Sequence, residues 1–333
     1  MRATPSNSTS EVSRRSFLRR AGVLASVGAA APDLISLSAA QRESPKGPKI
    51  YALWDLDGCS GIFTREQCWW WEPGVRESVA KEARGIMTAD VNAGSAALLA
   101  AGVSELIVCD THHGGGNLFA DQMLQDPRIT YQHHKLGIED GKRRWMPGLN
   151  ETVTGFMLPG HHAKAGTRGA FLPHTWTLSW TDFQINGQSV GEMGIEACFA
   201  GHWDIPVIFA HGDETACAEA VRQFPWIVTS VVKWGMDWHE SCNGMDVEKA
   251  HQQTAAKMKE AIEKLKRGEC RPYKPTLPMT VRVQMNTIEG AVKAAQLPGV
   301  LRIDDHSVEA RVGRQCDVVK WLLGEGLDMP PKV

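Results

Sequence analysis

The alternation of short apolar runs with longer segments of helical periodicity constrains the fold of this sequence more than any other feature. The apolar runs have the length of buried strands, and the segments between them repeat apolar residues at helical spacing. The predicted strands are 49–57, 104–109, 129–132, 152–158, 206–210 and 228–234, and the predicted helices are 76–100, 117–126, 191–200 and 245–266. This order predicts an α/β fold with a mainly parallel sheet and flanking helices.

A change of composition near residue 271 predicts a smaller C-terminal α/β subdomain. Two prolines occur within Arg271–Pro275, and the residues that follow predict a β-α-β-α portion over 271–325. Its expected elements are strands at 279–284 and 300–312 and helices at 286–296 and 315–323. The larger α/β domain is expected to cover 48–270, and within it Phe183–Val190 predicts a hairpin with Asn186–Gly187 as the tight turn.

The first forty residues have the features of an export signal. Arg14 and Arg15 precede Phe17, a mildly apolar stretch follows over 21–31, and Ser38–Ala40 offers the small residues that signal peptidases accept. This combination predicts a twin-arginine (Tat) signal peptide over residues 1–40 and export of the mature protein, to the periplasm in a cell that has one. The other interpretation of the same residues is a basic helix of the mature fold.

Charge and length exclude several classes of protein. The chain has 333 residues and a net charge of −2. Residues 1–40 hold five arginines and two acidic residues, so their removal lowers the net charge by three, to −5. This balance leaves no excess of basic side chains to neutralise nucleic-acid phosphates, so we expect no nucleic-acid partner. Beyond the N-terminal segment, no apolar run reaches the roughly 20 residues of a membrane-spanning helix, so we expect no membrane anchor.

Eight cysteines are spread along the chain without a C-x-x-C pair, which argues against a zinc ribbon or a thioredoxin motif. Cys109 and Cys198 lie in apolar runs and are expected to stay buried thiols. Cys242 and Cys270 flank the predicted helix 245–266, so they are candidate disulfide partners in an oxidising compartment.

Three predicted strands end in residue types that bind metal ions. Residues i and i+2 of an extended chain point to the same side, as the two aspartates at the end of the first strand would. In a parallel sheet the carboxyl ends of the strands lie at one edge, where ligand sites form. The residues are Asp55 and Asp57 at the end of the first strand, His112 after the second and His162 after the fourth, and Glu192 begins the helix after the hairpin.

Carboxylates together with neutral imidazoles are the ligand set of zinc or manganese, whereas magnesium and calcium prefer oxygen ligands alone. Two aspartates, two histidines and one glutamate suit two ions about 3.5–4 Å apart with one bridging carboxylate. Taken singly, an aspartate at a strand end is commonly a helix cap, and a single histidine a hydrogen-bonded core residue. His113 and His161 adjoin the candidates but are expected to point to the other face of their strands. Asp110 either orients a ligand imidazole or caps a turn.

Several motifs, in this order and spacing, resemble the DppA-type zinc D-aminopeptidases. Each motif is weak alone, but together they span about residues 48–323. The segments are Tyr51–Ile62, Arg84–Thr88 with Asn92, Val108–His112, Gly160–Ala165 with Gly169 and His174, Ile185–Gly194, Asp204–Val207 with Gly212 and Asp213, and Leu297–Val300.

This resemblance implies two zinc ions per chain, with manganese or another divalent ion as a substitute. One ion would be held by Asp55, Asp57 and His112. The other would be held by Asp55, His162 and Glu192, so that Asp55 bridges. His174 matches the residue proposed in the family as nucleophile or acid/base. The resemblance further implies removal of an N-terminal D-residue from a small peptide, and a homo-oligomer, which in the family is a decamer of two stacked pentamers.

Three features depart from the family's pattern. Asp57 stands where the family usually has glutamate, so its carboxylate is one methylene shorter. The stretch from Gly169 to His174 is one residue longer than usual and places Pro173 before the histidine. The run Trp69–Trp71 has no counterpart in the pattern, and it either lines an entrance or a subunit contact or packs under a surface loop.

The expected reaction is metal-assisted hydrolysis. A water between the two ions, its pKa lowered from about 15.7 toward about 7, attacks the peptide carbonyl while His174 transfers the proton. Two rival interpretations fit the same sequence. One is an exported metal-dependent amidase or other hydrolase with a different small substrate. The other is a non-catalytic periplasmic binding protein, which requires two similar α/β lobes and no bound metal.

Overall fold

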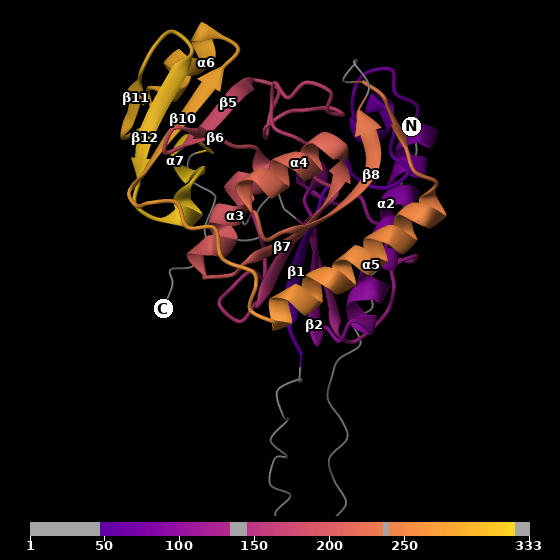
Figure 1. Cartoon of the computed structure of the whole chain (residues 1–333). Coiled ribbons are helices and arrows are strands. Elements are labelled where there is room, and N and C mark those ends of the chain that lie inside the picture. Colours follow the sequence, from indigo (N-terminus) through magenta and orange to yellow (C-terminus); the bar gives the residue numbers. More distant parts are fainter. Residues whose placement is uncertain (1–46, 134–144, 236–239, 324–333) are drawn as a thin grey trace, which may run out of the picture. The chain divides into compact units, whose positions relative to one another are not determined.

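The strands predicted from the apolar runs assemble into a seven-stranded sheet in the order β3-β2-β1-β4-β7-β8-β9 (Figure 1). The computed structural model describes residues 47–133, 145–235 and 240–323. The strands are β1 (Lys49–Trp54), β2 (Glu105–Asp110), β3 (Ile129–His133), β4 (Gly155–Pro159), β7 (Val207–Asp213), β8 (Val228–Gly235) and β9 (Cys242–Gly244). Every neighbouring pair is parallel except β8 with β9. The prediction of a mainly parallel sheet is confirmed.

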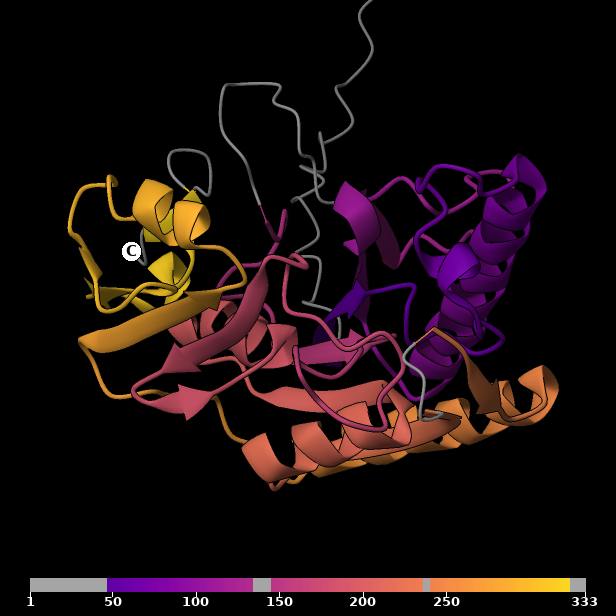
Figure 2. The same ribbon diagram turned by 90° about the horizontal axis from the view of Figure 1, so that it is seen from above.

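Helices pack on this sheet, as the two views in Figures 1 and 2 show. The longest two, α2 and α5, lie side by side. The helices are α1 (Arg65–Cys68), α2 (Glu77–Ala100), α3 (Glu192–His202), α4 (Glu214–Gln223), α5 (Val247–Lys266), α6 (Ile288–Ala294) and α7 (Lys320–Leu323), with short 3-10 turns at η1 (His112–Gly114) and η2 (Gln315–Asp317). Within the described ranges, none of the helices has both the length and the apolar character needed to cross a bilayer.

Strand β1 shows how the sheet is buried on both faces. Ile50, Ala52 and Trp54 belong to a hydrophobic core that includes residues of α2 and α5. Tyr51 and Leu53 belong to a second core that includes residues of α3 and α4. Successive side chains of a strand point to opposite faces, so a strand covered on both sides needs an unbroken apolar run, which is the pattern of this segment.

A second, antiparallel sheet has the order β11-β12-β10-β5-β6. Its strands are β5 (Trp180–Ile185), β6 (Gln188–Ser189), β10 (Met279–Met285), β11 (Val300–Arg302) and β12 (Ser307–Val312). Asn186 and Gly187 both have positive φ, 51° and 79°, so the predicted β5–β6 hairpin and its tight turn are confirmed. The described residues belong to one compact unit, Ser44–Val333, in which β10 pairs with β5. The domain boundary at residue 271 stays a prediction.

Two predictions of secondary structure are wrong. Residues 117–126 are not helical, because main-chain amides of this segment bond to side chains of α2 in place of the repeating main-chain bonds of a helix. The amide of Phe119 donates to Thr88 Oγ1 and the amide of Leu124 donates to Asn92 Oδ1. The single strand expected over 300–312 is two strands, β11 and β12, which pair antiparallel.

The predicted pairing of Cys242 with Cys270 is also wrong. All eight cysteines are free thiols, and all but Cys270 are buried. The two candidates lie beyond opposite ends of α5, whose 20 residues span about 30 Å. A disulfide requires Cα atoms closer than about 7 Å, so the helix holds these thiols too far apart.

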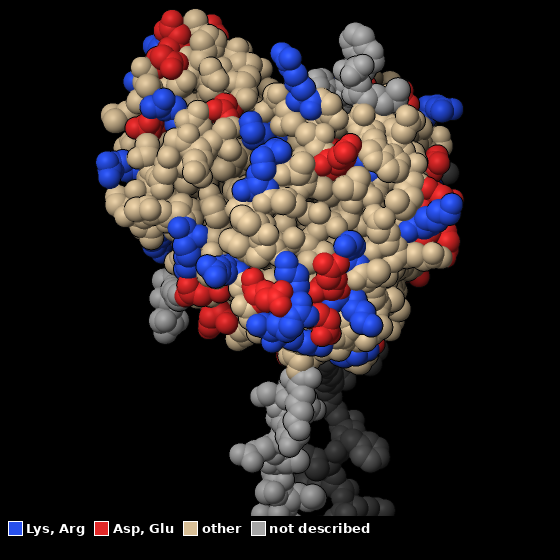
Figure 3. All heavy atoms as spheres, in the orientation of Figure 1, with Lys and Arg blue, Asp and Glu red and all other residues tan. Residues whose placement is uncertain are grey.

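Side chains of both charge signs are intermixed on the face that carries α4 and α5 (Figure 3). The absence of a nucleic-acid partner stays a prediction. The Tat signal predicted for residues 1–40 lies outside the described residues.

Candidate metal centre and active site

The ends of three neighbouring strands bring the predicted ligands together. β2, β1 and β4 are adjacent in the sheet, so their carboxyl ends lie side by side. Asp55 follows β1, His112 follows β2 and His162 follows β4. The chain runs from β1 to β2 and β3 on one side, and places β4 and β7 on the other side of β1. Ligand sites of open α/β sheets form at such a reversal of strand order.

The loops after β1 and β4 pack against each other through their main chains. The amide of Asp55 donates to the carbonyl of Pro159 at 3.1 Å, and the amide of Gly58 donates to the carbonyl of Gly160 at 2.6 Å. Gly160 has φ +77°, and a Cβ at this position would overlap the carbonyl oxygen of Asp55. Only glycine combines this backbone conformation with so close an approach, which holds Asp55 beside His162.

Glu192 reaches the same place as the first residue of α3, after the β5–β6 hairpin. Its Oε1 accepts a hydrogen bond from the main-chain amide of Trp176 at 2.6 Å and lies 3.3 Å from Nε2 of His162. A carboxylate in the first turn of a helix is stabilised by the helix dipole, so α3 favours the ionised form of this ligand.

The five predicted ligands form two groups that share Asp55. In the first group, Nδ1 of His112 lies 2.8 Å from Oδ1 of Asp55 and 3.6 Å from Oδ1 of Asp57. In the second, Nε2 of His162 lies 3.7 Å from Oδ2 of Asp55, and Glu192 completes the group. In each group, one potential ligand atom from every residue lies within 4.8 Å of the others, and all five side chains are buried. The structure thus brings together the five residues that the sequence singled out.

Several polar atoms of these groups lack the partners that a buried side chain needs. Both carboxylate oxygens of Asp57 and Nε2 of His162 are buried without a hydrogen bond. Nε2 of His112 donates to the carbonyl of Cys68 at 2.8 Å, so in the neutral ring the lone pair of Nδ1 faces the carboxylate of Asp55. Such an arrangement is stable only with a proton or a cation between the two atoms. The donor set and these unpaired atoms fit divalent metal ions.

The charges of the cluster also favour a cation. Burial raises the pKa of Asp55, but the hydrogen bond and charge of His112 outweigh burial and hold this pKa below its ordinary value. Burial lowers the pKa of His112, but the charges of Asp57 and Asp55 raise it to about 9. Burial likewise opposes ionisation of Glu192, yet the charge of His162 lowers its pKa to about 2. The carboxylates of Asp55 and Glu192 therefore stay ionised and attract positive charge, which a divalent ion supplies.

His174 is the most open member of the cluster. Its side chain is 16% exposed, and its Nε2 lies 3.8 Å from Oε1 of Glu192. Its ring stacks on His162 with the centroids 3.8 Å apart. Nδ1 donates to the carbonyl of Leu172 at 2.8 Å, which leaves Nε2 as the nitrogen with a lone pair. Burial and the charge of His162 lower the pKa of His174, so its ring is neutral. His174 also forms a third group of potential ligands with Asp57 and His162.

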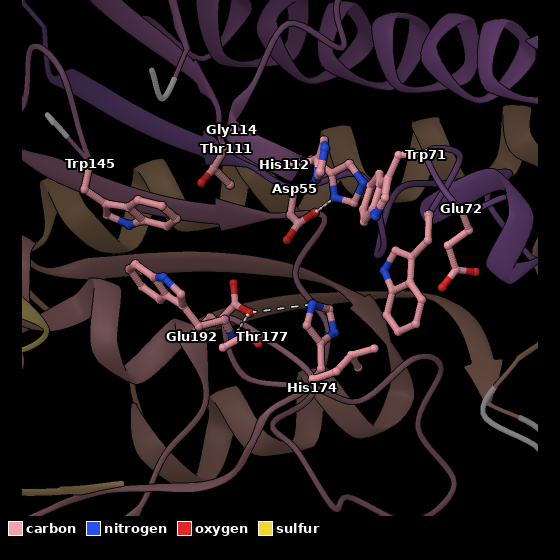
Figure 4. Close-up of a pocket in the computed structure, with 14 residues that line it drawn as sticks. Asp55, Trp71, Glu72, Thr111, His112, Gly114, Trp145, His174, Thr177 and Glu192 are labelled. Carbon is pink, nitrogen blue, oxygen red and sulfur yellow. Dashed lines mark hydrogen bonds and ion pairs between the residues drawn. The ribbon is translucent and has the colours of Figure 1, made fainter. Parts of the chain in front are cut away.

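A cavity of about 460 Å³ opens onto the cluster (Figure 4). Asp55, His112, His174 and Glu192 line it. Asp57 and His162 do not, which agrees with their deeper burial. The cluster is therefore accessible to a small molecule from one side.

The structure shows where the tryptophan run and the two histidines next to the predicted ligands, His113 and His161, lie relative to the cavity. Trp69 and Trp71 line the cavity. His113 was expected to point away but lines the cavity too, because its φ of +47° turns the chain where we assumed a continuing strand. His161 does point away, and its Nε2 lies 2.7 Å from Oε2 of Glu196.

Asp110 closes a turn and does not contact the imidazole of His112. Its carboxylate accepts hydrogen bonds from the amide and the side chain of Asn117 at 2.6 and 3.0 Å. Asn117 Nδ2 in turn donates to the carbonyl of His112 at 2.7 Å. Asp110 thus fixes the main chain that carries His112, while the carbonyl of Cys68 fixes the tautomer of its ring.

Sequence analysis did not single out Lys233, which lies fully buried in β8 beneath the loop that carries Asp57. Its Nζ donates to the carbonyl of Asp57 at 2.7 Å and to the carbonyl of Ile62 at 2.6 Å. The one sequence signal was a lysine inside a strand without other charged residues, which is rare for a buried strand unless the charge has partners.

Replacing Lys233 by methionine is expected to lower the free energy of unfolding by about 1–3 kcal/mol, because two buried carbonyls lose their donor. Methionine keeps the length of the side chain and removes a buried charge, which offsets part of the loss. Urea unfolding of the metal-free protein measures the change. Lys257→Met, at a half-exposed position of α5, is the control. Equal unfolding midpoints for both variants and the parent would contradict this role of Lys233.

The fold and the site together define a class of protein. It is an α/β protein with a buried cluster of carboxylates and imidazoles that could hold divalent cations, at the carboxyl edge of a mainly parallel sheet and open to a cavity. The model of the D-aminopeptidase family, peptidase family M55, matches residues 49–323. The chain therefore belongs to the D-aminopeptidase family, and the resemblance noted from the motifs is confirmed.

Both a sequence relative and a solved structure are similar to this chain. The D-aminopeptidase of Bacillus subtilis (strain 168) is 30% identical over 188 residues, which are 56% of this chain and 63% of that protein. The chain thus matches less than two thirds of the length of this relative. The solved structure of the Zn-dependent D-aminopeptidase DppA from Bacillus subtilis, a self-compartmentalizing protease, has a TM-score of 0.72 at 24% identity, over 83% of this chain and 95% of that chain. This likeness confirms the fold.

Proposed function

We propose that this protein is a zinc-dependent aminopeptidase that removes N-terminal D-residues from short peptides. The observation that supports this most is the convergence of Asp55, Asp57, His112, His162 and Glu192 in two groups that share Asp55, beside a cavity that Asp55, His112 and Glu192 line. Membership of the D-aminopeptidase family supports the reaction, and the zinc dependence of DppA supports the choice of metal.

In this proposal Asp55, Asp57 and His112 hold one zinc ion, and Asp55, His162 and Glu192 hold the second. Bound zinc would supply a Lewis acid for the peptide carbonyl and would lower the pKa of a nearby water. The main chain pre-orients the ligands, because the carbonyl of Cys68 fixes the ring of His112 and the amide of Trp176 fixes the carboxylate of Glu192.

His174 carries the proton in this mechanism. Its Nδ1 is engaged by the carbonyl of Leu172, so its Nε2 is the nitrogen that can accept a proton from the attacking water. The same nitrogen then returns the proton to the amine that leaves. The ring is held by its stacking on His162, which keeps Nε2 near Glu192 during both steps.

Removal of divalent ions is expected to abolish hydrolysis of D-alanyl peptides, because the reaction then lacks its Lewis acid. The protein is dialysed against a chelator, its metal content is measured by mass spectrometry, and zinc or manganese is added back. We expect about two zinc ions per chain in the active protein and recovery of activity on reconstitution. A protein that binds no divalent ion, or that hydrolyses equally well without one, would overturn the proposal.

Two rivals remain to be separated from this function. A matched panel of D- and L-aminoacyl peptides and simple amides distinguishes an aminopeptidase for D-residues from another metal-dependent amidase. The binding-protein alternative required two similar α/β lobes. Among the described residues, one sheet has seven mostly parallel strands and the other five antiparallel strands, so the architecture does not favour it.

We also propose that the chain forms a homo-oligomer, a decamer as in the family pattern, because its structural relative is described as self-compartmentalizing. Light scattering of the purified protein measures the mass. Export through the Tat pathway is proposed from residues 1–40 and is tested by the location of the protein after Arg14→Lys and Arg15→Lys are combined. Retention of the variant in the cytoplasm is the expected result.

A further inference from the structure

Aromatic rings line the cavity on one side in a group that we call the first aromatic wall, formed by Trp69, Trp71 and His113. Trp71 stacks on His113 with the ring centroids 3.7 Å apart and the planes within 9° of parallel. Trp69 packs edge-on to His174 at 5.5 Å, so this wall reaches the cluster itself. Trp71 keeps 40% of its surface exposed, and it lines the cavity.

A second aromatic wall consists of Trp145 and Trp176, which also line the cavity. Their rings stack with centroids 4.0 Å apart at 24°. The main-chain amide of Trp176 donates to Oε1 of Glu192, so this wall is tied directly to a proposed metal ligand. Trp71 and Trp145 lie at opposite sides of the cavity in Figure 4, with Asp55 and His112 between them.

The main chain of both walls is held in an unfavourable conformation. Trp176 has φ +64° and His113 has φ +47°, values that residues other than glycine rarely adopt. Such residues persist where the surrounding structure fixes them, and they gather at functional sites. The fold therefore holds Trp176 and His113 at the cavity against the preference of their own backbone.

We infer that the site selects substrates with aromatic or large apolar side chains on both sides of the scissile bond. This inference rests on the proposed function and names the substrate class of the same site. A carbonyl at the metal cluster has one wall on each side, so the residues before and after the scissile bond each meet a stacked pair of rings. Aromatic and large apolar side chains bury these ring faces, whereas the methyl groups of an alanyl dipeptide leave most of them in water.

The selectivity is tested with four dipeptides and the zinc-loaded enzyme: D-Phe-D-Phe, D-Phe-D-Ala, D-Ala-D-Phe and D-Ala-D-Ala. We expect each replacement of phenylalanine by alanine to lower kcat/KM about tenfold or more, the usual effect of a large change in an apolar pocket. A kcat/KM for D-Ala-D-Ala that equals or exceeds the value for D-Phe-D-Phe would overturn the inference.

Substitutions assign each wall to one side of the bond. Trp71→Ala and Trp176→Ala are each expected to lower the preference for phenylalanine about tenfold at one position of the dipeptide and to leave the preference at the other position unchanged. Trp71→Phe and Trp176→Phe are expected to retain the preference at both positions. Trp234→Ala is the matched control, because Trp234 is 41% exposed and lies outside this cavity. If Trp176→Ala fails to fold, Trp145→Ala removes the same wall. Unchanged preferences in both wall variants would contradict the inference.

A binding measurement separates this inference from the proposed function. If the zinc-loaded protein hydrolyses none of the four dipeptides, the aminopeptidase proposal fails, but calorimetric titration with free D-phenylalanine and D-alanine still tests the walls. We expect D-phenylalanine to bind about tenfold more tightly than D-alanine. We expect one of the two variants, Trp71→Ala or Trp176→Ala, to remove this difference. Equal affinities for the two amino acids would overturn the inference whatever the activity.

Discussion

Replacing Asp55 by asparagine is expected to remove both bound metal ions and to lower kcat/KM on the order of 10³-fold or more. The residue belongs to both groups of proposed ligands, and asparagine keeps its size but removes its charge. Loss of the ions removes several kcal/mol of transition-state stabilisation, and each 1.4 kcal/mol is about tenfold in rate. Metal content per chain and kcat/KM on a D-aminoacyl peptide are measured on the same sample.

Two companion variants make this result specific. Asp57→Asn is expected to lose one ion and keep the other, because in the proposed ligation Asp57 serves only the group with His112. Asp121→Asn changes an exposed aspartate and is expected to retain both ions and full activity. An Asp55→Asn protein with two ions and the parent's activity would remove the basis of the proposed metal centre.

Replacing His174 by glutamine is expected to lower kcat by about 10²–10⁴-fold without changing the metal content, the usual loss when a general acid/base is removed. The reason is geometric: His174 lies at the opening of the cluster, and its Nδ1 bonds to a main-chain carbonyl whereas its Nε2 does not. Kinetics at saturating substrate and metal analysis measure the two effects separately.

The alternative role of His174 predicts a different pattern. If it ligates an ion together with Asp57 and His162, the group that the structure also allows, His174→Gln would lose metal as well as activity. His306→Gln, at a histidine outside the cavity whose Nδ1 bonds to the carbonyl of Met285, is the control and should change neither quantity. Loss of an ion in the His174 variant alone would assign it as a ligand and would remove it from proton transfer.

The strands and the five candidate ligands could be predicted because their signals are local. The unbroken apolar run of β1 predicts a strand directly, because a strand buried on both faces needs such a run. Four of the candidates lie just beyond strand ends that the sequence places at one edge of a sheet. These residues are Asp55, Asp57, His112 and His162. The Asn186–Gly187 turn is equally local, because it depends on the backbone preferences of two residues.

The predictions that were wrong, and the residue that was not predicted, have causes that lie outside the local sequence. Residues 117–126 have a helical pattern but bond to side chains of α2, a competition that periodicity does not reveal. His113 was assigned to the wrong face because a positive φ follows the end of β2. Lys233 has its partners in the loop after β1, so its role as a buried donor appears only once β8 is placed beneath that loop.

The sequence by itself determined the α/β class, the family and the five side chains with metal-binding chemistry, because repeating apolar patterns and short motifs are carried by neighbouring residues. Only the tertiary structure decided that a cavity opens onto these side chains and that two aromatic walls line it. Those facts depend on contacts between Trp71 and His113 and between Trp145 and Trp176, residues that are far apart along the chain. Distances of this kind follow from the packing of whole elements, which no single segment specifies.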